Sequence, residues 1–319
     1  MGKVLITASH FQSLCADALN LLKENGHEVI LGDSDIPYFS FEQLKQWAPV
    51  IDAAIIGMDL WDEKVFGIAP KLKVLARFGV GTDNIDLQAA KKHGVKVVNA
   101  RGMNSNAVAE LAAALILNAL RNIPDLNRRL SGGEWARRVG HELKGKTVGL
   151  LGFGDIGGKV AKKLSGFEAR LLAYDPLPDF AKAEKLGVLM TDLDTILLQS
   201  DILSIHMPSI PSTYHIVNAE LIAKMKRGAY LVNTARGALV DTEALCRAVK
   251  EGVLRGAALD VYEKEPLPPD DPVLHTEGIL CTPHTGAETA ETYKAISMMT
   301  AQAVIDVLNG GNPQNWLNR

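Results

Sequence analysis

The sequence has few cysteines and no long apolar or basic run. Its 319 residues include three cysteines, Cys15, Cys246 and Cys281, whose odd number and wide spacing indicate neither a disulfide framework nor a zinc site. The most apolar stretch, residues 108–120, is too short to span a bilayer. Lys and Arg number 34 against 37 Asp and Glu, and no basic run favours nucleic acid or an anionic membrane. We therefore expect neither kind of partner.

The chain also lacks the signs of secretion and of metal binding. Its first residues, MGKVLITASHF, pass directly into an apolar strand without the apolar core of a secretory signal. The eight histidines show no ligand spacing, so no metal is expected. A content of 47% hydrophobic and 22% charged residues is typical of a soluble globular protein. We expect a cytoplasmic protein of about two domains, at roughly 150 residues each.

Short β-rich runs alternate with helical patterns along most of the chain, which predicts an α/β protein with parallel sheets. A first series of strands is expected at residues 4–7, 28–31, 53–56, 73–77 and 95–99. A second series begins at residue 147 and comprises TVGLLGFG, RLLAYDP, ILSIHMP, AYLVNTARG, GAALDVY and ILCTPH.

Two long helical patterns suggest how the two series are connected. One, at residues 105–122, lies between the two series, and the other, at 290–308, follows the last strand. The last helix has nothing left to pair with in the second sheet. We therefore predict a discontinuous first domain, residues 1–99 and 288–319, and a second domain of residues 100–287.

The segment TVGLLGFGDIGGKVAKKL carries a glycine pattern typical of dinucleotide binding. Gly152 permits a tight turn, Gly154 lets the backbone approach a pyrophosphate, and Gly157 lets helix and strand pack closely. The anion would then lie at the positive end of the helix. Asp175 ends the next strand, where an acid binds the ribose diol and repels a 2′-phosphate, so NAD is favoured over NADP. An ordinary glycine-rich turn followed by an unrelated aspartate is the alternative.

Three ionisable residues follow strands of the second series, where open α/β sheets bind their ligands. Arg236 follows AYLVNTA, Glu265 follows GAALDVY in a proline-rich loop, and His284 follows ILCTP. An alcohol that loses hydride to a nicotinamide also loses its hydroxyl proton, which requires a base such as histidine. A carboxylate beside the imidazole stabilises its protonated form and orients it. The planar guanidinium suits a substrate carboxylate and polarises the neighbouring carbonyl.

Each of the three residues also has a structural interpretation. Arg236 would be a surface cation near a helix, Glu265 a solvated loop acid, and His284 the cap of the following helix. Isolated ionisable residues mostly have such roles. Their occurrence at three separate strand ends of one cofactor domain favours catalysis.

Four segments, GFGDIG, NTARGALVD, DVYEKEP and TPHTG, closely resemble the signatures of the NAD-dependent D-2-hydroxyacid dehydrogenases. Residues 77–110 resemble the 3-phosphoglycerate dehydrogenase-like branch of that family. The resemblance covers nearly the whole chain. It implies a Rossmann-type cofactor domain and a discontinuous flavodoxin-like substrate domain with a cleft between them. It also implies Arg236, Glu265 and His284 as the catalytic residues, with His284 as the acid/base.

The resemblance implies further contacts with substrate and cofactor. The substrate would meet Arg77, Asn104 and the backbone N–H groups of Val80 and Gly81. His206 is expected to pack or to contact the cofactor, and Asp260 to approach the nicotinamide amide. The full set of expected cofactor contacts is Gly152, Gly154, Asp155, Ile156, Gly157, Asp175, His206, Met207, Pro208, Thr213, Thr234, Ala235, Asp260 and Gly286.

The predicted function is the NAD-dependent interconversion of a D-2-hydroxy acid and its 2-oxo acid. The substrate is either D-3-phosphoglycerate or an unphosphorylated acid such as glyoxylate, hydroxypyruvate or a bulkier 2-oxo acid. A non-enzymatic NAD(H)-sensing, corepressor-like protein is an alternative of another class, and hydride abstraction from a formate- or phosphite-type donor is a third. The long Ala-rich helix and the segment around Trp135, SGGEWARRVGHELKG, form an arm-like insertion between the domains. In the family that the chain resembles, such an element commonly builds a two-fold dimer, so a homodimer is expected.

Overall fold

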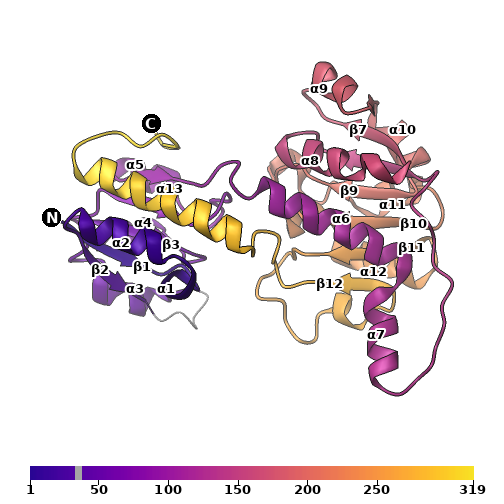
Figure 1. Cartoon of the computed structure of the whole chain (residues 1–319), viewed down its shortest axis with the longest axis horizontal. Helices are drawn as coiled ribbons and strands as arrows, with labels where there is room; N and C mark the ends of the chain where they lie inside the picture. Colours follow the sequence, from indigo (N-terminus) through magenta and orange to yellow (C-terminus); the bar gives the residue numbers. More distant parts are fainter. Residues whose placement is uncertain (33–37) are drawn as a thin grey trace. The chain divides into compact units, whose positions relative to one another are not determined.

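The structure, a computed structural model, describes residues 1–32 and 38–319, in which strands and helices alternate (Figure 1). Close contacts divide the chain into two compact units. Unit 1 is Met1–Asn104 with Ala287–Arg319, and unit 2 is Ser105–Gly286. The boundaries expected from sequence, 99/100 and 287/288, lie a few residues away. Each unit contains a parallel sheet with helices on both faces, which confirms the predicted α/β class.

Unit 1 has a five-stranded parallel sheet in the order β2-β1-β3-β4-β5. This is the strand order of flavodoxin-like domains. The central strand β3, AAII, is buried throughout because helices cover both faces of the sheet. The strands are β1 (Lys3–Ile6), β2 (Glu28–Leu31), β3 (Ala53–Ile56), β4 (Val74–Arg77) and β5 (Lys96–Val98).

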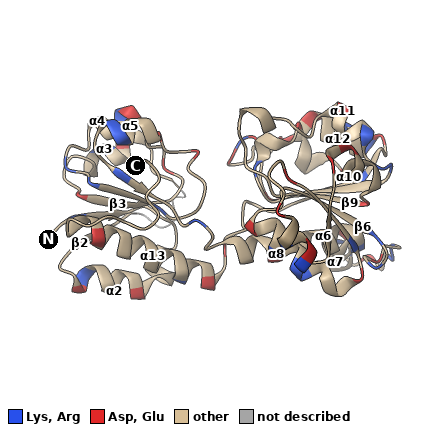
Figure 2. Ribbon diagram, turned by 90° about the horizontal axis from the view of Figure 1, so that it is seen from above, with Lys and Arg blue, Asp and Glu red and all other residues tan. Residues whose placement is uncertain are grey.

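Helices cover both faces of this sheet (Figure 2). The long helix α13 (Ala290–Leu308) comes from the end of the chain and packs on α2, β3 and β4. Its buried side chains, such as Tyr293 and Val304, complete the apolar core on that face. The other helices of unit 1 are α1 (Phe11–Leu14), α2 (Ala16–Glu24), α3 (Phe41–Trp47), α4 (Glu63–Gly67) and α5 (Leu87–Lys92).

Unit 2 has a seven-stranded parallel sheet in the order β12-β11-β10-β9-β6-β7-β8. Counted within the unit, its first six strands follow the dinucleotide-binding order 3-2-1-4-5-6, with a seventh strand added at the edge. The strand order reverses between β6 and β9, which is the switch point at which such sheets bind ligands. The strands are β6 (Thr147–Leu151), β7 (Arg170–Tyr174), β8 (Val188–Met190), β9 (Ile202–Ile205), β10 (Ala229–Asn233), β11 (Leu254–Leu259) and β12 (Ile279–Cys281).

The first helix of unit 2, α6 (Ser105–Arg121), packs on α8 through small buried side chains such as Ala109 and Ala112. It is followed by Asn122, the N-cap of α7 (Ile123–Ser131), which has φ 54°. No single helix of the described residues is long and apolar enough to cross a membrane. Helices α6 and α7 meet that requirement only together, and they bend by 63° at their junction.

The remaining helices of unit 2 alternate with its strands. The three longest among them have the N-cap residues Gly154 (α8), Asp192 (α10) and Asp241 (α12). The two aspartates each accept a hydrogen bond from an amide of the first helical turn. They are α8 (Asp155–Leu164), α9 (Phe180–Lys185), α10 (Leu193–Gln199), α11 (Ala219–Lys224) and α12 (Thr242–Lys250), with short 3₁₀ turns η1 (Ser165–Phe167), η2 (Pro211–Thr213), η3 (Gly237–Leu239) and η4 (Pro272–His275).

Candidate active site

Six neighbouring strands of unit 2 end in one row. Ladder partners run across the sheet in a single line: Tyr174, Leu151, Ile205, Asn233, Leu259 and Cys281. Because the strands are parallel, the residue that follows each partner lies at the carboxyl edge, where open α/β sheets bind ligands. These residues are Asp175, Gly152, His206, Thr234, Asp260 and Thr282. The first five are predicted site residues, so the register brings them to one edge.

The three glycines of the turn after β6 differ in what a side chain would meet there. Gly152 has φ 95°, and a Cβ there would lie 2.7 Å from the carbonyl carbon of His206. A Cβ at Gly157 would lie 2.3 Å from the carbonyl oxygen of Gly152. At Gly154 a Cβ would meet nothing within 4 Å, so neither packing nor backbone strain requires glycine there. An open approach to that backbone is what a pyrophosphate needs. Asp155 and Ile156 follow and open α8.

Asp175 holds the glycine turn in place. Its Oδ2 accepts a hydrogen bond from the amide of Phe153 at 2.8 Å, and its Oδ1 accepts one from the amide of Leu177 at 2.9 Å. A carboxylate oxygen has more than one acceptor site, so these bonds leave capacity for a ribose diol. The structure thus adds a role in positioning the turn, and ribose binding stays a prediction.

Two buried polar atoms at the edge of the sheet have no hydrogen-bond partner among the described residues. They are Thr234 Oγ1 and His206 Nδ1. Buried polar atoms in folded proteins are nearly always hydrogen-bonded, so such a pair at a ligand-binding edge fits a polar ligand. His206 Nε2 lies 2.9 Å from Ser204 Oγ, and burial lowers the pKa of His206 to about 4. His206 is therefore neutral and suited to contact a ligand rather than to carry a proton.

His284 and Glu265 form a close pair. His284 Nδ1 lies 2.6 Å from Glu265 Oε2, and Glu265 Oε1 accepts a hydrogen bond from the amide of Tyr262 at 2.9 Å. With its Nδ1–H donated to the carboxylate, the imidazole has Nε2 left for proton exchange. The side chain of His284 is 42% exposed, whereas that of Glu265 is 21% exposed. The histidine is thus accessible to a ligand while its partner is largely covered.

The carboxyl group of Glu265 stays ionised. Burial by itself raises its pKa. The hydrogen bond and the charge of His284, the amide of Tyr262 and the positive charge of Arg236 together lower that pKa by more than burial raises it. The net effect holds the pKa of Glu265 below its ordinary value. An ionised carboxylate beside the imidazole is what orients a catalytic histidine and stabilises its protonated form.

The buried carboxylate of Asp260 anchors the turn that carries His284. Asp260 is 1% exposed and accepts hydrogen bonds from Thr282 Oγ1 at 2.6 Å and from the amides of Thr285 and Gly286 at 2.8 Å each. His284 itself has φ 51°, a conformation that costs free energy for a residue with a Cβ. Bonds on both sides of the histidine hold it there. The expected contact of Asp260 with the nicotinamide amide stays a prediction.

Arg236 is positioned by a close contact between two loops. A Cβ at Gly237 would lie 1.8 Å from the carbonyl carbon of Tyr262, so the two backbones touch. The Arg236 carbonyl accepts a hydrogen bond from Asn233 Nδ2 at 2.9 Å, and its guanidinium donates to the Ala235 carbonyl at 2.7 Å. The contact brings the arginine to the loop that carries Glu265. Asn233 was not identified from the sequence as a residue of this site. Its polar side chain, buried at the end of an apolar strand, is the feature that could have indicated it.

The other expected cofactor residues of unit 2 lie in the loop after β9 and beside the catalytic turns. Thr213 Oγ1 donates to the Pro208 carbonyl at 2.8 Å and accepts from the amide of Ile210 at 2.9 Å, so it shapes this loop. Met207 is buried below the loop. Among the described residues, no group of three or more His, Cys, Asp or Glu side chains could hold a metal ion.

The expected substrate residues lie in unit 1. Arg77 donates from Nη1 to the Phe78 carbonyl at 2.6 Å and from Nε to the Gly81 carbonyl at 3.1 Å. Asn99 Nδ2 donates to the Val80 carbonyl at 2.6 Å. Arg77 and Asn99 therefore fasten the turn whose amides are expected to bind a carboxylate. Asn104 ends this part of unit 1 and is half-buried.

Comparison with known proteins gives consistent matches. Residues 113–286 match the sequence model of the D-isomer specific 2-hydroxyacid dehydrogenase, NAD binding domain. The chain is 38% identical over 319 residues to the D-3-phosphoglycerate dehydrogenase of Archaeoglobus fulgidus, covering 99% of the chain and 59% of that relative. It is 40% identical over 308 residues to the glyoxylate reductase of Thermofilum pendens, covering 94% and 91%. The chain thus spans less than two thirds of the first relative and nearly all of the second.

Solved structures also match over the whole chain. The D-lactate dehydrogenase of Lactobacillus jensenii, solved with NAD⁺, superposes with a TM-score of 0.80 at 27% sequence identity, covering 99% of this chain and all of the other. That structure contains a bound dinucleotide, and the open backbone at Gly154 in this chain suits the same class of ligand.

Proposed function

Because the chain belongs to the family of D-isomer-specific 2-hydroxyacid dehydrogenases, we propose that it interconverts a D-2-hydroxy acid and its 2-oxo acid with NAD(H). The observation that carries this proposal is the 2.6 Å contact between His284 Nδ1 and Glu265 Oε2 beside the dinucleotide edge. Oxidation of NADH with a 2-oxo acid, followed by absorbance, tests it. A protein that binds NADH but oxidises it with no 2-oxo acid would instead fit the corepressor-like alternative.

The chemistry divides among three side chains. When bound, NAD⁺ accepts the hydride that leaves C2 of the hydroxy acid. His284 Nε2 removes the hydroxyl proton in this direction and returns it in the other, and ionised Glu265 stabilises the imidazolium in between. The guanidinium of Arg236 binds the substrate carboxylate and polarises the carbonyl, which lowers the entropic part of the barrier. A proton acceptor suits a hydroxyl donor, whose oxidation releases the hydroxyl proton, better than a formate-type donor, whose oxidation to CO₂ releases none.

We further propose that the preferred substrate is unphosphorylated. Arg77, the cation among the expected substrate residues, donates from its guanidinium to two carbonyls of its own turn. A cation bound to backbone carbonyls is less able to bind a phosphate as well. Glyoxylate and hydroxypyruvate are therefore the favoured 2-oxo acids, and the 2-oxo acid of D-3-phosphoglycerate is the second candidate.

A matched pair of substrates distinguishes the two candidates. Hydroxypyruvate and its 3-phosphate differ only by the phosphate, so the ratio of their kcat/KM values measures what that group contributes. We expect hydroxypyruvate to be preferred. A preference for the 3-phosphate would establish the second candidate.

For the assembly we propose a homodimer built through residues 123–139, a part of the arm-like insertion that is called the arm from here on. Helix α7 has no buried residue, and the arm exposes Ile123, Leu130, Trp135 and Val139. Trp135 is 82% and Val139 98% exposed. Exposed apolar side chains gathered on one segment are typical of protein interfaces.

For location and partners we propose the cytoplasm, with a small-molecule acid as the substrate and no nucleic-acid or membrane partner. The three free cysteines and the near balance of 34 basic and 37 acidic residues support this proposal. Fractionation of cells that produce the protein tests the location.

A further inference from the structure

Lys182, in α9, reaches the glycine turn. Its ammonium donates to the carbonyl oxygens of Phe153, at 2.9 Å, and of Gly154, at 2.7 Å, and it lies 4.8 Å from the centroid of the Phe153 ring. The amide of Phe153 donates to Asp175. The backbone at Phe153 is therefore held from both sides, by the acid that follows β7 and by the lysine of the next helix.

Gly158 provides the space for this lysine. A Cβ at Gly158 would lie 2.4 Å from Lys182 Cε and 2.7 Å from Lys182 Nζ. Gly158 lies inside α8, where glycine is less favourable than alanine by about 0.5–1 kcal/mol. The contact with Lys182 gives a physical reason for glycine at this helical position.

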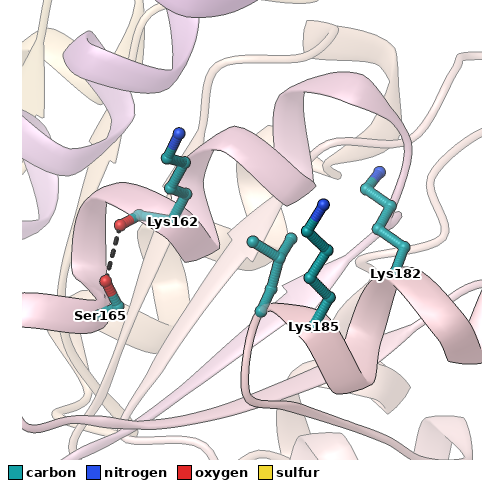
Figure 3. A pocket seen from close by; sticks show the side chains of 5 residues that line it. Lys162, Ser165, Lys182 and Lys185 are labelled. Carbon is teal, nitrogen blue, oxygen red and sulfur yellow. Dashed lines mark hydrogen bonds between the residues drawn. The ribbon is translucent and has the colours of Figure 1, made fainter.

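Lys182 is one of three lysines around a hollow of about 540 Å³ (Figure 3). The hollow is lined by Lys162, Ser165, Lys182, Lys185 and Leu186, and no carboxylate of the described residues lines it. The three lysine side chains extend in the same direction in Figure 3. Only Lys182 of the three bonds to the glycine turn in the described part of the chain.

We propose that Lys182 is a positioning residue for the dinucleotide. Its ammonium neutralises the negative ends of two carbonyl dipoles, which would otherwise repel the pyrophosphate. It also holds the turn in the conformation in which the first amides of α8 face the anion. It also adds a positive charge beside the anion. The inference rests on the proposed function only in that NAD(H) is the ligand.

A pair of variants separates this role from a general effect of charge. Lys182→Met removes the ammonium and keeps an apolar stem over Gly158, so we expect NADH to bind roughly tenfold more weakly, with kcat at saturating NADH within about twofold of wild type. Lys185→Met makes the same change in the same hollow without touching the turn. Its NADH affinity should stay within about twofold of wild type. Titration followed by NADH fluorescence measures the NADH affinity of both variants, and steady-state kinetics at saturating NADH measure kcat.

A second variant reaches the same contact from the other side. Gly158→Ala displaces the end of Lys182 and should weaken NADH binding, yet alanine favours the helix, so thermal stability should not fall. Because both changes break one contact, the double variant Gly158→Ala/Lys182→Met should bind NADH no more weakly than Lys182→Met alone.

Three outcomes would contradict the inference. Lys182→Met and Lys185→Met with equal NADH affinities would remove the special role of Lys182. A loss of kcat at saturating NADH as large as the loss of affinity would indicate a purely structural role. Wild-type protein that binds no NADH would overturn the proposed function and this inference together, and that result is distinct from the other two.

Discussion

At the scale of single residues, the proposed chemistry depends on His284. Replacing it with alanine removes the group that exchanges the hydroxyl proton, so we expect kcat to fall by about 10²- to 10⁴-fold. The expected dinucleotide contacts lie elsewhere on the edge, so NADH affinity should be nearly unchanged. Steady-state kinetics and NADH fluorescence check the two halves of this prediction. Turnover close to that of wild type would exclude His284 as the acid/base.

Glu265 should make part of the stability depend on pH. Its pKa is lower in the folded protein than in the unfolded chain, so the unfolded state binds a proton first as the pH falls. The stabilising contribution is complete above the ordinary glutamate pKa of about 4.3 and is lost as the pH falls through the lower folded value. Between about pH 6 and about pH 3, the difference in Tm between wild type and Glu265→Gln should therefore shrink. A difference that stays constant or grows towards acid pH would contradict this sign.

At the scale of elements, the glycine turn between β6 and α8 allows a paired test. Alanine at Gly154 meets nothing within 4 Å, so Gly154→Ala should keep its Tm within about 2 °C and still lose NADH affinity. Alanine at Gly157 would lie 2.3 Å from a backbone oxygen, so Gly157→Ala should lower the free energy of unfolding by about 1–3 kcal/mol. Calorimetry and NADH titration of the two variants give the comparison. The reverse order of Tm values would refute this reading of the turn.

At the scale of the whole molecule, the proposed role of the arm in dimer formation can be tested. We expect a solution mass of twice the chain mass of 34.4 kDa. Trp135→Asp places a charge at the centre of the exposed apolar segment and should shift the mass towards the monomer. Leu198→Asp, at a side chain that is 63% exposed on α10, is the matched control and should stay dimeric. Light scattering measures all three, and a wild-type monomer would contradict the dimer.

The sequence alone determined the class of fold, the ligand class and the three residues expected to do the chemistry, because glycine patterns and strand ends are local features. Most strands were predicted to within a residue or two. The strand β8 was missed, since it has three residues at an edge and offers little periodicity. The glycine turn was recognised because its three glycines stand at fixed spacing between a strand and a helix.

Only the tertiary structure decided which side chains meet. The common line across six strands depends on the register of the ladders, and the burial of Asp260 depends on loops that follow two of those strands. The contacts of Lys182 with Phe153 and Gly154 likewise join residues that are 29 and 28 positions apart in the sequence. Local sequence encodes the conformation of each segment, whereas the partner of a polar side chain is set by packing between segments that are distant along the chain.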